Sequence, residues 1–541
     1  MNRTRETQLS LFEEYTQPVM KKTVKKTLTD SDIAKYANYT LEQYTADVEQ
    51  NGLAQTWNLL CDYALIYGEN NQLLQVKNFG ELYEIGLAVQ DKILKKKNGQ
   101  YYTPDDVATV MSKWLLSLPG SNVCDVGCGT GKLILTYLSL LGESDAKKLI
   151  SEGRLYLYDL DETALKICKT SLALIYGREI SNKIHDVVCD FLDASVHLPE
   201  DCKVISNPPY ASISNLEDYW GPSNVIRDSM ELYSSFMEKE FAESVSTVVI
   251  TPFSFISSHK FFSLRKEMCE EGHGFIVAFD NVPGNIFCGR KKGIFNTNTA
   301  NSVRASITVY TQGNPETGYR VTPLIRFKST ERAKLLQTEV LESFLPEKGQ
   351  IINSSNTMFR KVDKRVEKLF NAWIEKSNDT FLSLLDDVGE YVLAMPNTCR
   401  YFTVASNAPM KRNGQIILRF SDPDKFYYAY CLINSSFVYW HWRIYDGGIT
   451  YPKGLLEEMP VFFDSLSDDE RLFFRNTAKD MLKEAKNFVI TKNNVGTQEN
   501  IKFPRKYRDL INREIIHILG QDQNEKDLDV VHSNMALEVN V

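Results

Sequence analysis

The chain has 541 residues, which exceeds one compact domain of ordinary size and predicts about two to four domains. Its hydrophobic fraction of 43% and charged fraction of 24% are typical of a soluble globular protein, so a single small binding module and wholesale disorder are excluded. The net charge of -8 argues against a partner that requires a uniformly positive protein, although a local basic patch can still bind phosphate.

Cysteine spacing and hydropathy set further limits. The ten cysteines include no C-x-x-C pair, so the sequence predicts neither a disulfide framework nor a zinc site of familiar spacing, and we expect no metal. No apolar run approaches the roughly 18 residues of a membrane span, and the first residues lack an apolar stretch of signal-peptide length. We therefore expect a cytoplasmic protein without membrane contact.

Residues 1–28 are polar and include a cluster of four lysines, which predicts a flexible tail. Residues 8–12 read QLSLF and match the pentapeptide by which many bacterial replication and repair proteins bind the sliding clamp. In that interpretation Leu11 and Phe12 fill an apolar pocket, Gln8 hydrogen-bonds at its rim, and Leu9 belongs to the same motif. The alternative is that this apolar patch docks the tail onto the neighbouring helices.

Three larger segments follow the tail. Residues 29–98 have helical periodicity and a capping box at Thr40 and Gln43, which predicts a helical N-terminal domain. Residues 99–315 alternate amphipathic helices with seven short apolar strands, at VCDVG, LYLYDLD, HDVVCDF, KVISNPPY, STVVITPF, GFIVAFD and RASITVY. This alternation predicts an α/β domain with a mostly parallel sheet. Residues 320–520 are mixed and rich in aromatics, with a helical part from about residue 467, and residues 521–541 are expected to form a loose tail.

A glycine-rich turn follows the first expected strand. Residues 122–133 read NVCDVGCGTGKL, and Gly127, Gly129 and Gly131 permit a tight turn with close approach of a ligand at a helix N-terminus. A phosphate loop is rejected, because the spacing differs and Leu133 stands where a magnesium-binding hydroxyl is required. The alternative to a binding loop is a tight connection.

The next two strands end in acidic residues. Asp159 and Asp161 follow the second strand, where a carboxylate can accept hydrogen bonds from both hydroxyls of a ribose. The third strand ends in Asp190 and Phe191, a carboxylate that could receive an adenine amino group and a ring that could stack on it. Each acid taken singly is equally well explained as a helix cap.

The fourth strand ends in the tetrapeptide Asn207-Pro208-Pro209-Tyr210. The prolines remove two backbone donors, so the carbonyls of Asn207 and Pro208 remain available as acceptors. With the Asn207 amide oxygen they could hold the two hydrogens of an exocyclic amine, whose lone pair then attacks an electrophilic methyl group. Tyr210 would stack against the ring that bears the amine. The alternative is a rigid strand-to-loop turn.

The order of these pieces resembles the S-adenosylmethionine-dependent N6-adenine DNA methyltransferases whose cofactor motifs precede the catalytic motif and whose recognition domain follows. The matching pieces, in family order, are NGQYYTPDDVATVM (98–111), DVGCGTGKL (125–133), LYDLD (157–161), CDF (189–191), NPPY (207–210), VITPFSF (249–255), and GNIF with SVRASITVY (284–310). The resemblance implies a Rossmann-like class I methyltransferase domain at residues 99–315 and a target-recognition domain at residues 320–520.

The resemblance also assigns roles to residues. It implies that the methionine moiety of the cofactor is bordered by Thr103, Pro104, Asp125, Gly127 and Gly129. Asp159 is implied to bind the ribose, Asp190 and Phe191 the adenine of the cofactor, and residues 207–210 the target base. A second aromatic against the target base would be Phe287, with Phe295 as a rival because the match around GNIF is imperfect.

Contacts to DNA are expected beside this pocket. Residues 281–315 contain no acidic residue. The candidate phosphate contacts in this segment are Arg290, Lys291, Lys292 and Arg304. The alternative is a solvated basic loop. In the C-terminal half, His441 and Arg443 could read base edges, and Arg505, Lys506 and Arg508 could neutralise phosphates.

The sequence thus predicts site-specific methylation of adenine N6 in double-stranded DNA, with S-adenosylmethionine as cofactor and extrusion of the base from the duplex. Alternatives are methylation of RNA or of a protein glutamine, and a modification subunit that needs a separate specificity protein. If the chain belongs to a restriction-modification system, we expect a separate restriction endonuclease to cleave the DNA.

Overall fold

The computed structural model describes residues 28–68, 71–75, 78–90, 103–213, 223–287, 303–399, 401–492 and 498–533. The QLSLF pentapeptide, the basic residues 290–292 and the rival aromatic Phe295 lie outside these ranges. Within them, no helix combines the length and apolar character that crossing a bilayer demands.

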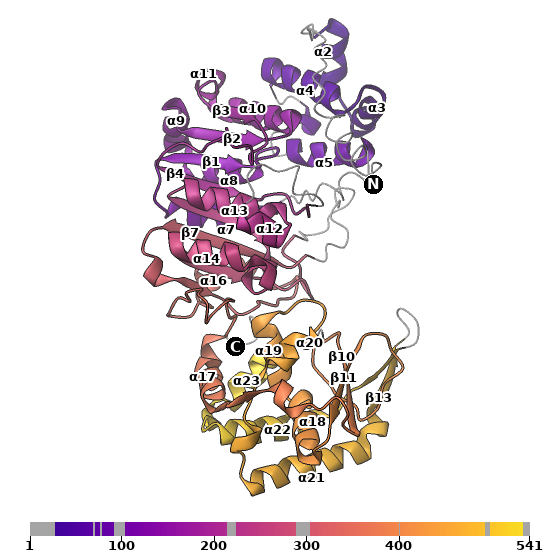
Figure 1. The fold of residues 1–541 in the computed structure, drawn as a ribbon. Coiled ribbons are helices and arrows are strands. Elements are labelled where there is room, and N and C mark those ends of the chain that lie inside the picture. The colour runs from indigo at the N-terminus through magenta and orange to yellow at the C-terminus, as the bar shows by residue number, and fades with distance from the viewer. Residues whose placement is uncertain are drawn as a thin grey trace, which may run out of the picture.

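The N-terminal part of the described chain is helical (Figure 1). The capping box at Thr40 and Gln43 is confirmed, since each side chain accepts a backbone N–H of the other residue. Trp57 lies at the centre of the core that these helices share, and its indole N–H donates to the hydroxyl of Tyr44 at 3.0 Å. The elements are α2 (Asp30–Ala37), α3 (Leu41–Asn51), α4 (Leu53–Tyr67), η1 (Gln72–Leu74) and α5 (Phe79–Gln90).

An eight-stranded sheet forms the middle of the molecule, in the order β3-β2-β1-β4-β5-β7-β6-β8. The first five strands in this order are parallel, β7 is antiparallel to both of its neighbours, and β8 is parallel to β6. The strands are β1 (Asn122–Val126), β2 (Leu155–Asp159), β3 (His185–Val188), β4 (Cys202–Ser206), β5 (Ser246–Pro252), β6 (Gly272–Ala278), β7 (Ala305–Gln312) and β8 (Tyr319–Val321). All seven predicted strands are confirmed, and so is the predicted α/β domain with a mostly parallel sheet.

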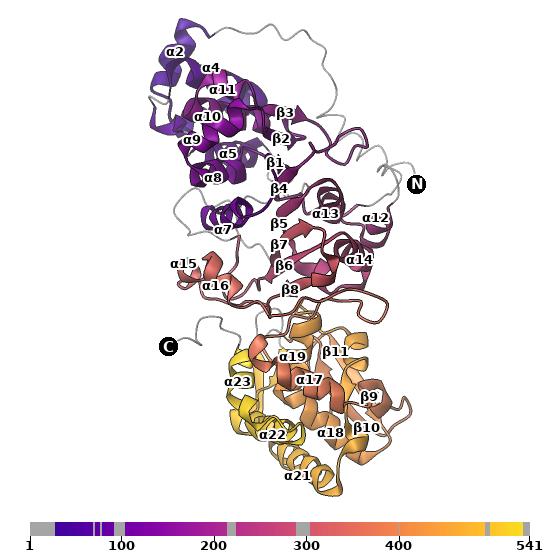
Figure 2. The ribbon, with the colours of Figure 1, turned by 90° about the vertical axis from the view of Figure 1, so that its left-hand side faces the viewer.

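Helices cover both faces of this sheet, as the edge-on view in Figure 2 shows. The central strands are almost wholly buried because both faces are covered, which explains why they read as apolar runs without alternation. The helices are α7 (Asp105–Leu116), α8 (Lys132–Leu141), α9 (Glu143–Ser151), α10 (Glu162–Tyr176), α11 (Arg178–Ser181), α12 (Asn224–Ser229), α13 (Leu232–Glu243), η4 (Phe253–Ile256), η5 (His259–Phe261), α14 (Phe262–Glu271), η7 (Pro315–Thr317), α15 (Arg332–Leu335) and α16 (Thr338–Glu342).

The sheet extends further along the chain than the sequence predicts. We expected the α/β domain to end at residue 315, but β8 adds three residues beyond that point and pairs with β6. The strand is too short to give a recognisable apolar pattern by itself. A strand of three residues can complete the sheet at this position because β8 lies at the edge and pairs with β6 alone.

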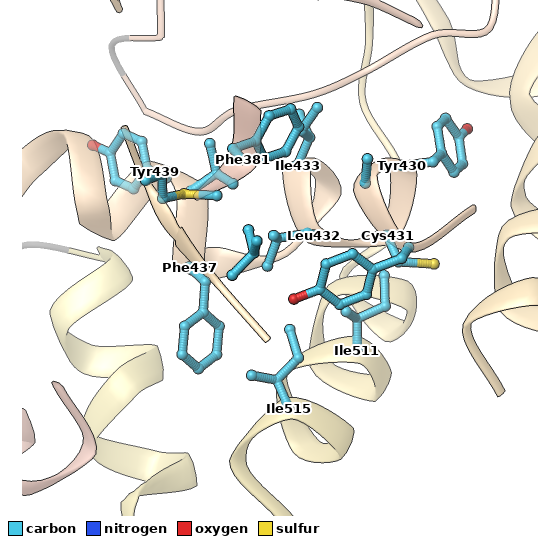
Figure 3. Close-up of a cluster of buried hydrophobic side chains, with 14 of the residues drawn as sticks. Phe381, Tyr430, Cys431, Leu432, Ile433, Phe437, Tyr439, Ile511 and Ile515 are labelled. Atoms are coloured by element: carbon cyan, nitrogen blue, oxygen red, sulfur yellow. The ribbon is translucent and has the colours of Figure 1, made fainter. Parts of the chain in front are cut away.

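The C-terminal part packs aromatic and aliphatic side chains of α18, α19 and α22 into one core, part of which Figure 3 shows. Its elements are η8 (Lys364–Val366), α17 (Glu367–Lys376), β9 (Asp379–Thr380), η9 (Phe381–Leu384), β10 (Tyr391–Pro396), β11 (Gln415–Phe420), α18 (Pro423–Asn434), α19 (Ser436–Tyr445), α20 (Lys453–Glu457), β12 (Pro460–Val461), η10 (Phe463–Ser465), α21 (Asp468–Glu484), η11 (Ala485–Phe488), β13 (Val489–Lys492), β14 (Gln498–Ile501), α22 (Arg505–Ile518), η12 (Asp522–Asn524) and α23 (Glu525–Ser533).

The part of the chain from about residue 467, expected to be helical, also contains two short strands. β13 and β14 pair antiparallel between α21 and α22. The run Val489-Ile490-Thr491 is β-branched at all three positions, and such side chains favour extended backbone over helix.

A buried carboxylate joins the C-terminal part to the sheet. Asp280 follows β6, is 1% exposed, and pairs with Arg304 (Nε to Oδ1, 3.0 Å), Arg326 (Nη2 to Oδ2, 2.8 Å) and Arg443 of α19 (Nη1 to Oδ2, 2.6 Å). Burial alone would raise the pKa of Asp280, but Arg443, Arg326 and Arg304 together hold this pKa well below its usual range. We refer to these four residues as the Asp280 cluster.

The Asp280 cluster corrects two sequence-based expectations. Arg304, expected to contact DNA phosphate, is only 7% exposed, because its guanidinium neutralises Asp280 instead of facing solvent. Arg443, considered as a reader of base edges, is 5% exposed in the same cluster. Its neighbour His441 is also buried, its ring nitrogen lies 2.9 Å from the hydroxyl of Tyr451, and burial lowers its pKa to about 3.

We expect Asp280→Asn to lower the free energy of unfolding by about 3–5 kcal/mol, because it leaves three buried guanidinium groups without a compensating charge. Urea denaturation followed by the fluorescence of the C-terminal tryptophans measures this change. Asp424→Asn, which breaks the more exposed ion pair with Arg475, is the control and should shift the transition far less. Equal shifts for the two variants would contradict a structural role for the cluster.

Candidate active site

The glycine loop lies between β1 and α8 and is shaped by three left-handed residues. Gly127, Gly129 and Gly131 have φ angles of +66°, +53° and +90°, which side-chain-bearing residues rarely adopt. A Cβ at Gly131 would also lie 2.4 Å from Cys168 Sγ, so the loop packs tightly against α10. Among the described residues, no atom apart from those of its chain neighbours lies within 4 Å of a Cβ built at Gly129. The loop is therefore packed against α10 at Gly131, whereas the described residues leave space for a ligand beside Gly129.

Two carboxylates hold the loop. Asp159, at the end of β2, accepts the backbone N–H of Gly129 at 2.7 Å through Oδ2 and that of Asp161 at 2.8 Å through Oδ1. Asp125 is fully buried, and its Oδ2 accepts the N–H of Ile134 in α8 at 3.1 Å. Burial raises the pKa of Asp159 to about 6 and that of Asp125 to about 8. Asp159 thus lies at the loop surface, whereas Asp125 supports the loop from inside.

The third strand end differs from the sequence-based expectation. Asp190 is exposed, and its Oδ1 accepts the N–H of Leu192 at 3.0 Å. The ring of Phe191 is 3% exposed, because it packs 5.3 Å from the ring of Phe236 and lies 4.9 Å from the ammonium group of Lys239. Of this predicted pair, only the carboxylate is open to a ligand in the structure.

The tetrapeptide after β4 is tied to residues that arrive from two other segments. The Asn207 amide donates from Nδ2 to Oγ1 of Thr103 at 3.0 Å. The hydroxyl of Tyr210 donates toward two acceptors, Asn207 Oδ1 at 2.8 Å and the carbonyl oxygen of Ile250 at 3.0 Å. These contacts orient the amide, with its nitrogen toward Thr103 and its oxygen toward Tyr210.

The tetrapeptide also adjoins the glycine loop. A Cβ built at Gly127 would lie 3.9 Å from the carbonyl oxygen of Asn207, so the two segments face each other at the carboxyl edge of the sheet. Thr103 is 5% exposed, and Pro104 forms the N-cap of α7. The sequence motifs around residues 103, 127 and 207 therefore meet at one place.

A second aromatic ring lies beside Tyr210. The rings of Tyr210 and Phe287 are 5.9 Å apart at an interplanar angle of 62°. Arg332 fixes the segment before Phe287, since it donates to the carbonyl oxygens of Asn285 at 2.8 Å and Ile286 at 2.6 Å. Phe287, the predicted second aromatic, therefore lies beside Tyr210, with 1% of its surface exposed in this structure.

The basic residues near the C-terminus are neutralised by acids of the same region. Arg505 forms ion pairs with Asp509 and Asp529, and Arg508 contacts the same two carboxylates. Lys506 is exposed. Of these three residues, only Lys506 forms no ion pair within the described part of the chain.

Sequence reasoning missed a contact from the N-terminal helices. The hydroxyl of Tyr83 in α5 donates to the carboxylate of Asp161, two residues after the loop-binding Asp159. No linear pattern indicates the Tyr83 contact, because its partners lie 78 residues apart.

Across the part of the chain that the structure covers, no group of three or more His, Cys, Asp or Glu side chains is arranged to hold a metal ion.

Comparison with known proteins agrees with this geometry. Residues 75–249 match the family described as N-6 DNA Methylase. The chain is similar to the type II methyltransferase M.VspI of Vibrio sp. (strain 343), at 29% identity over 136 residues, 25% of this chain and 30% of that protein. It is also similar to the type I restriction enzyme MpnII methylase subunit of Mycoplasma pneumoniae, at 22% identity over 237 residues, 39% of this chain and 41% of that protein.

Among solved structures, the DrdV–DNA complex matches with a TM-score of 0.42 and 14% identity, over 68% of this chain and 43% of that chain. The matches to the two curated relatives cover less than half of each relative's length. The matched segment runs from just before α5 to β5 and contains the glycine loop, the strand-end acids and the Asn-Pro-Pro-Tyr tetrapeptide. The similarity of this chain to the N-6 DNA Methylase family therefore covers all three of these features.

Proposed function

We propose that the chain transfers a methyl group from S-adenosylmethionine to N6 of adenine in double-stranded DNA. One observation carries the proposal: the Asn207 amide is oriented beside an open glycine loop, and Tyr210 and Phe287 adjoin it. The match of residues 75–249 to the N-6 DNA Methylase family supports it.

The residues present fit the cofactor. The loop is open above Gly129, and the carboxylate of Asp159 lies at that point, where it can accept hydrogen bonds from ribose hydroxyls. Asp190 provides a second exposed carboxylate at the neighbouring strand end. Bound there, S-adenosylmethionine supplies an electrophilic methyl group. Thr103, Pro104 and Gly127 would border its methionine end.

Asn207 and its neighbours would hold the target amine. The Asn207 amide oxygen and the carbonyl oxygen of Pro208 accept its two hydrogens, which draws the nitrogen lone pair out of conjugation with the ring. The amine nitrogen would then bond to the methyl carbon as the bond from sulfur to that carbon breaks, and the proton released afterwards from nitrogen would pass to solvent, so the site needs no dedicated base. Tyr210 and Phe287 would stack on the base after their present contact opens.

Extrusion of the adenine requires contacts to the surrounding duplex. We propose that residues 290–292 contact phosphates and that residues 320–520 recognise the target sequence. The QLSLF segment would bind a bacterial sliding clamp. In a restriction-modification system, a separate endonuclease would cleave the DNA. Such a substrate implies a cytoplasmic location. Transfer of labelled methyl groups to duplex DNA, RNA and protein by the single purified chain separates this proposal from the alternatives.

We expect Asn207→Ala to abolish methyl transfer while S-adenosylmethionine still binds, because the lost oxygen acts on the amine and not on the cofactor. Transfer of labelled methyl to duplex DNA and calorimetric titration with the cofactor measure the two effects separately. Loss of cofactor binding, with transfer retained at saturating cofactor, would contradict the role assigned to Asn207.

Tyr210→Ala should weaken the complex with an extruded base by about 1–3 kcal/mol, the scale of one base–aromatic stack. A duplex with 2-aminopurine at the target position reports extrusion by its fluorescence, which should rise less with this variant than with the wild-type protein. Tyr210→Phe keeps the ring and should retain the signal. An unchanged signal for Tyr210→Ala counts against stacking by Tyr210.

The affinity for S-adenosylmethionine should fall as the pH is lowered from 7 to 5. The pKa of Asp159 is about 6, so its carboxylate loses its charge in this interval and accepts ribose hydroxyls more weakly. If S-adenosylmethionine binds only when Asp159 is ionised, its affinity should be roughly tenfold lower at pH 5, one pH unit below that pKa. Calorimetry across this range tests it, and Asp159→Asn should bind weakly with little pH dependence. A pH-independent wild-type affinity would remove Asp159 from the ribose site.

A further inference from the structure

Helix α5 of the N-terminal part lies directly against the glycine loop. A Cβ built at Gly80, near the start of α5, would lie 3.0 Å from Oγ1 of Thr130 in that loop. One turn further on, the hydroxyl of Tyr83 donates to the carboxylate of Asp161. Helix α5 therefore contacts two of the segments that form the proposed cofactor site.

The hydrogen bonds continue from Tyr83 to the loop. Asp161 receives the Tyr83 hydroxyl on Oδ2, and its own backbone N–H donates to Asp159 Oδ1 at 2.8 Å. Asp159 Oδ2 in turn accepts the N–H of Gly129 at 2.7 Å. Asp161 Oδ1 caps α10 through the N–H groups of Thr163 and Ala164, at 2.9 and 3.1 Å. The position of Asp159 is thus set by the glycine loop on one side and by Asp161 on the other.

Tyr83 is held by the core of the N-terminal helices. It is 3% exposed, and its ring lies 6.3 Å from that of Trp57. Trp57 donates to the hydroxyl of Tyr44, which donates to the carbonyl oxygen of Leu82, the residue before Tyr83. A side chain fixed in this way can fix its partner in turn.

We propose that the N-terminal helices complete the S-adenosylmethionine site: α5 forms a wall over the glycine loop, and Tyr83 is a positioning residue that orients Asp159 through Asp161. The identity of the ligand rests on the proposed function. The alternative is that α5 only packs the N-terminal helices against α10.

The interface between the N-terminal helices and α10 offers a matched control. Lys166 of α10 donates to Asn58 Oδ1 at 2.9 Å and pairs with Asp62 of α4 at 3.3 Å, but contacts neither the glycine loop nor Asp159 in the described residues. Tyr83→Phe and Lys166→Met each remove polar contacts across the same interface. Only Tyr83→Phe touches the path to Asp159.

Calorimetric titration of the full chain with S-adenosylmethionine is the test. We expect Tyr83→Phe to raise the Kd by roughly five- to tenfold, as the loss of one hydrogen bond to a charged group allows. Lys166→Met should leave the Kd within about twofold of the wild-type value, the range of a distant surface change. A wild-type Kd for Tyr83→Phe, or an equal rise for both variants, overturns the proposal. Failure of the wild-type chain to bind S-adenosylmethionine would instead reject the proposed function and this inference together.

A second pair of variants tests the wall directly. Gly80→Ala should also weaken binding, because the added Cβ would press on Thr130 Oγ1 at 3.0 Å. Combining Gly80→Ala with Thr130→Ala removes that oxygen, so the double variant should bind S-adenosylmethionine with the affinity of the Thr130→Ala single variant. No weakening by Gly80→Ala, or weakening that Thr130→Ala does not relieve, would contradict close contact between α5 and the loop.

Discussion

The carboxylate of Asp280 is the only acid in its cluster, and three buried guanidinium groups from separate parts of the chain depend on it. A charge taken out of water is tolerated only when opposite charges and hydrogen bonds replace the lost solvent. Asp280 follows β6, Arg304 precedes β7, Arg326 comes after β8, and Arg443 belongs to α19. One electrostatic requirement therefore holds the end of β6 beside the start of β7 and attaches the C-terminal core to them.

This attachment affects the candidate site because Asp280 lies at the start of the segment that contains Phe287. The chain leaves Asp280 toward Phe287 and returns at Arg304, so the cluster fixes both ends of the segment that carries the second aromatic of the pocket. Arg332 holds the same segment from α15 and also pairs with Asp106 of α7. The segment that carries Phe287 is thus supported by ion pairs and hydrogen bonds to elements on several sides, which suits the proposal that Tyr210 and Phe287 separate to admit a base.

The sequence predicts much of this site because parallel strands end at a common edge. Glycine and carboxylate residues at successive strand ends, such as Gly129 and Asp159, can be read as neighbours from chain order alone. Partners joined across 163 residues, such as Asp280 and Arg443, leave no such pattern. The residue types at positions 304, 441 and 443 suggested DNA contacts, yet burial decides their roles. The role of Tyr83 was missed for a related reason, because helical periodicity describes the buried face of α5 but not which loop that face covers.

The antiparallel placement of β7 has a consequence for how such a protein can diversify. Ala278 at the end of β6 pairs with Ser306 near the start of β7, so the intervening chain leaves and re-enters the sheet at the same edge, where Asn207 and Asp159 also lie. Residues inserted after Phe287 and before Arg304 would shift neither the register of any strand pair nor the residues of the Asp280 cluster. Loop closure entropy grows only slowly with length, so such changes cost little stability. The connection between β6 and β7 is therefore a place where evolution can alter the surroundings of the target base while the core stays constant.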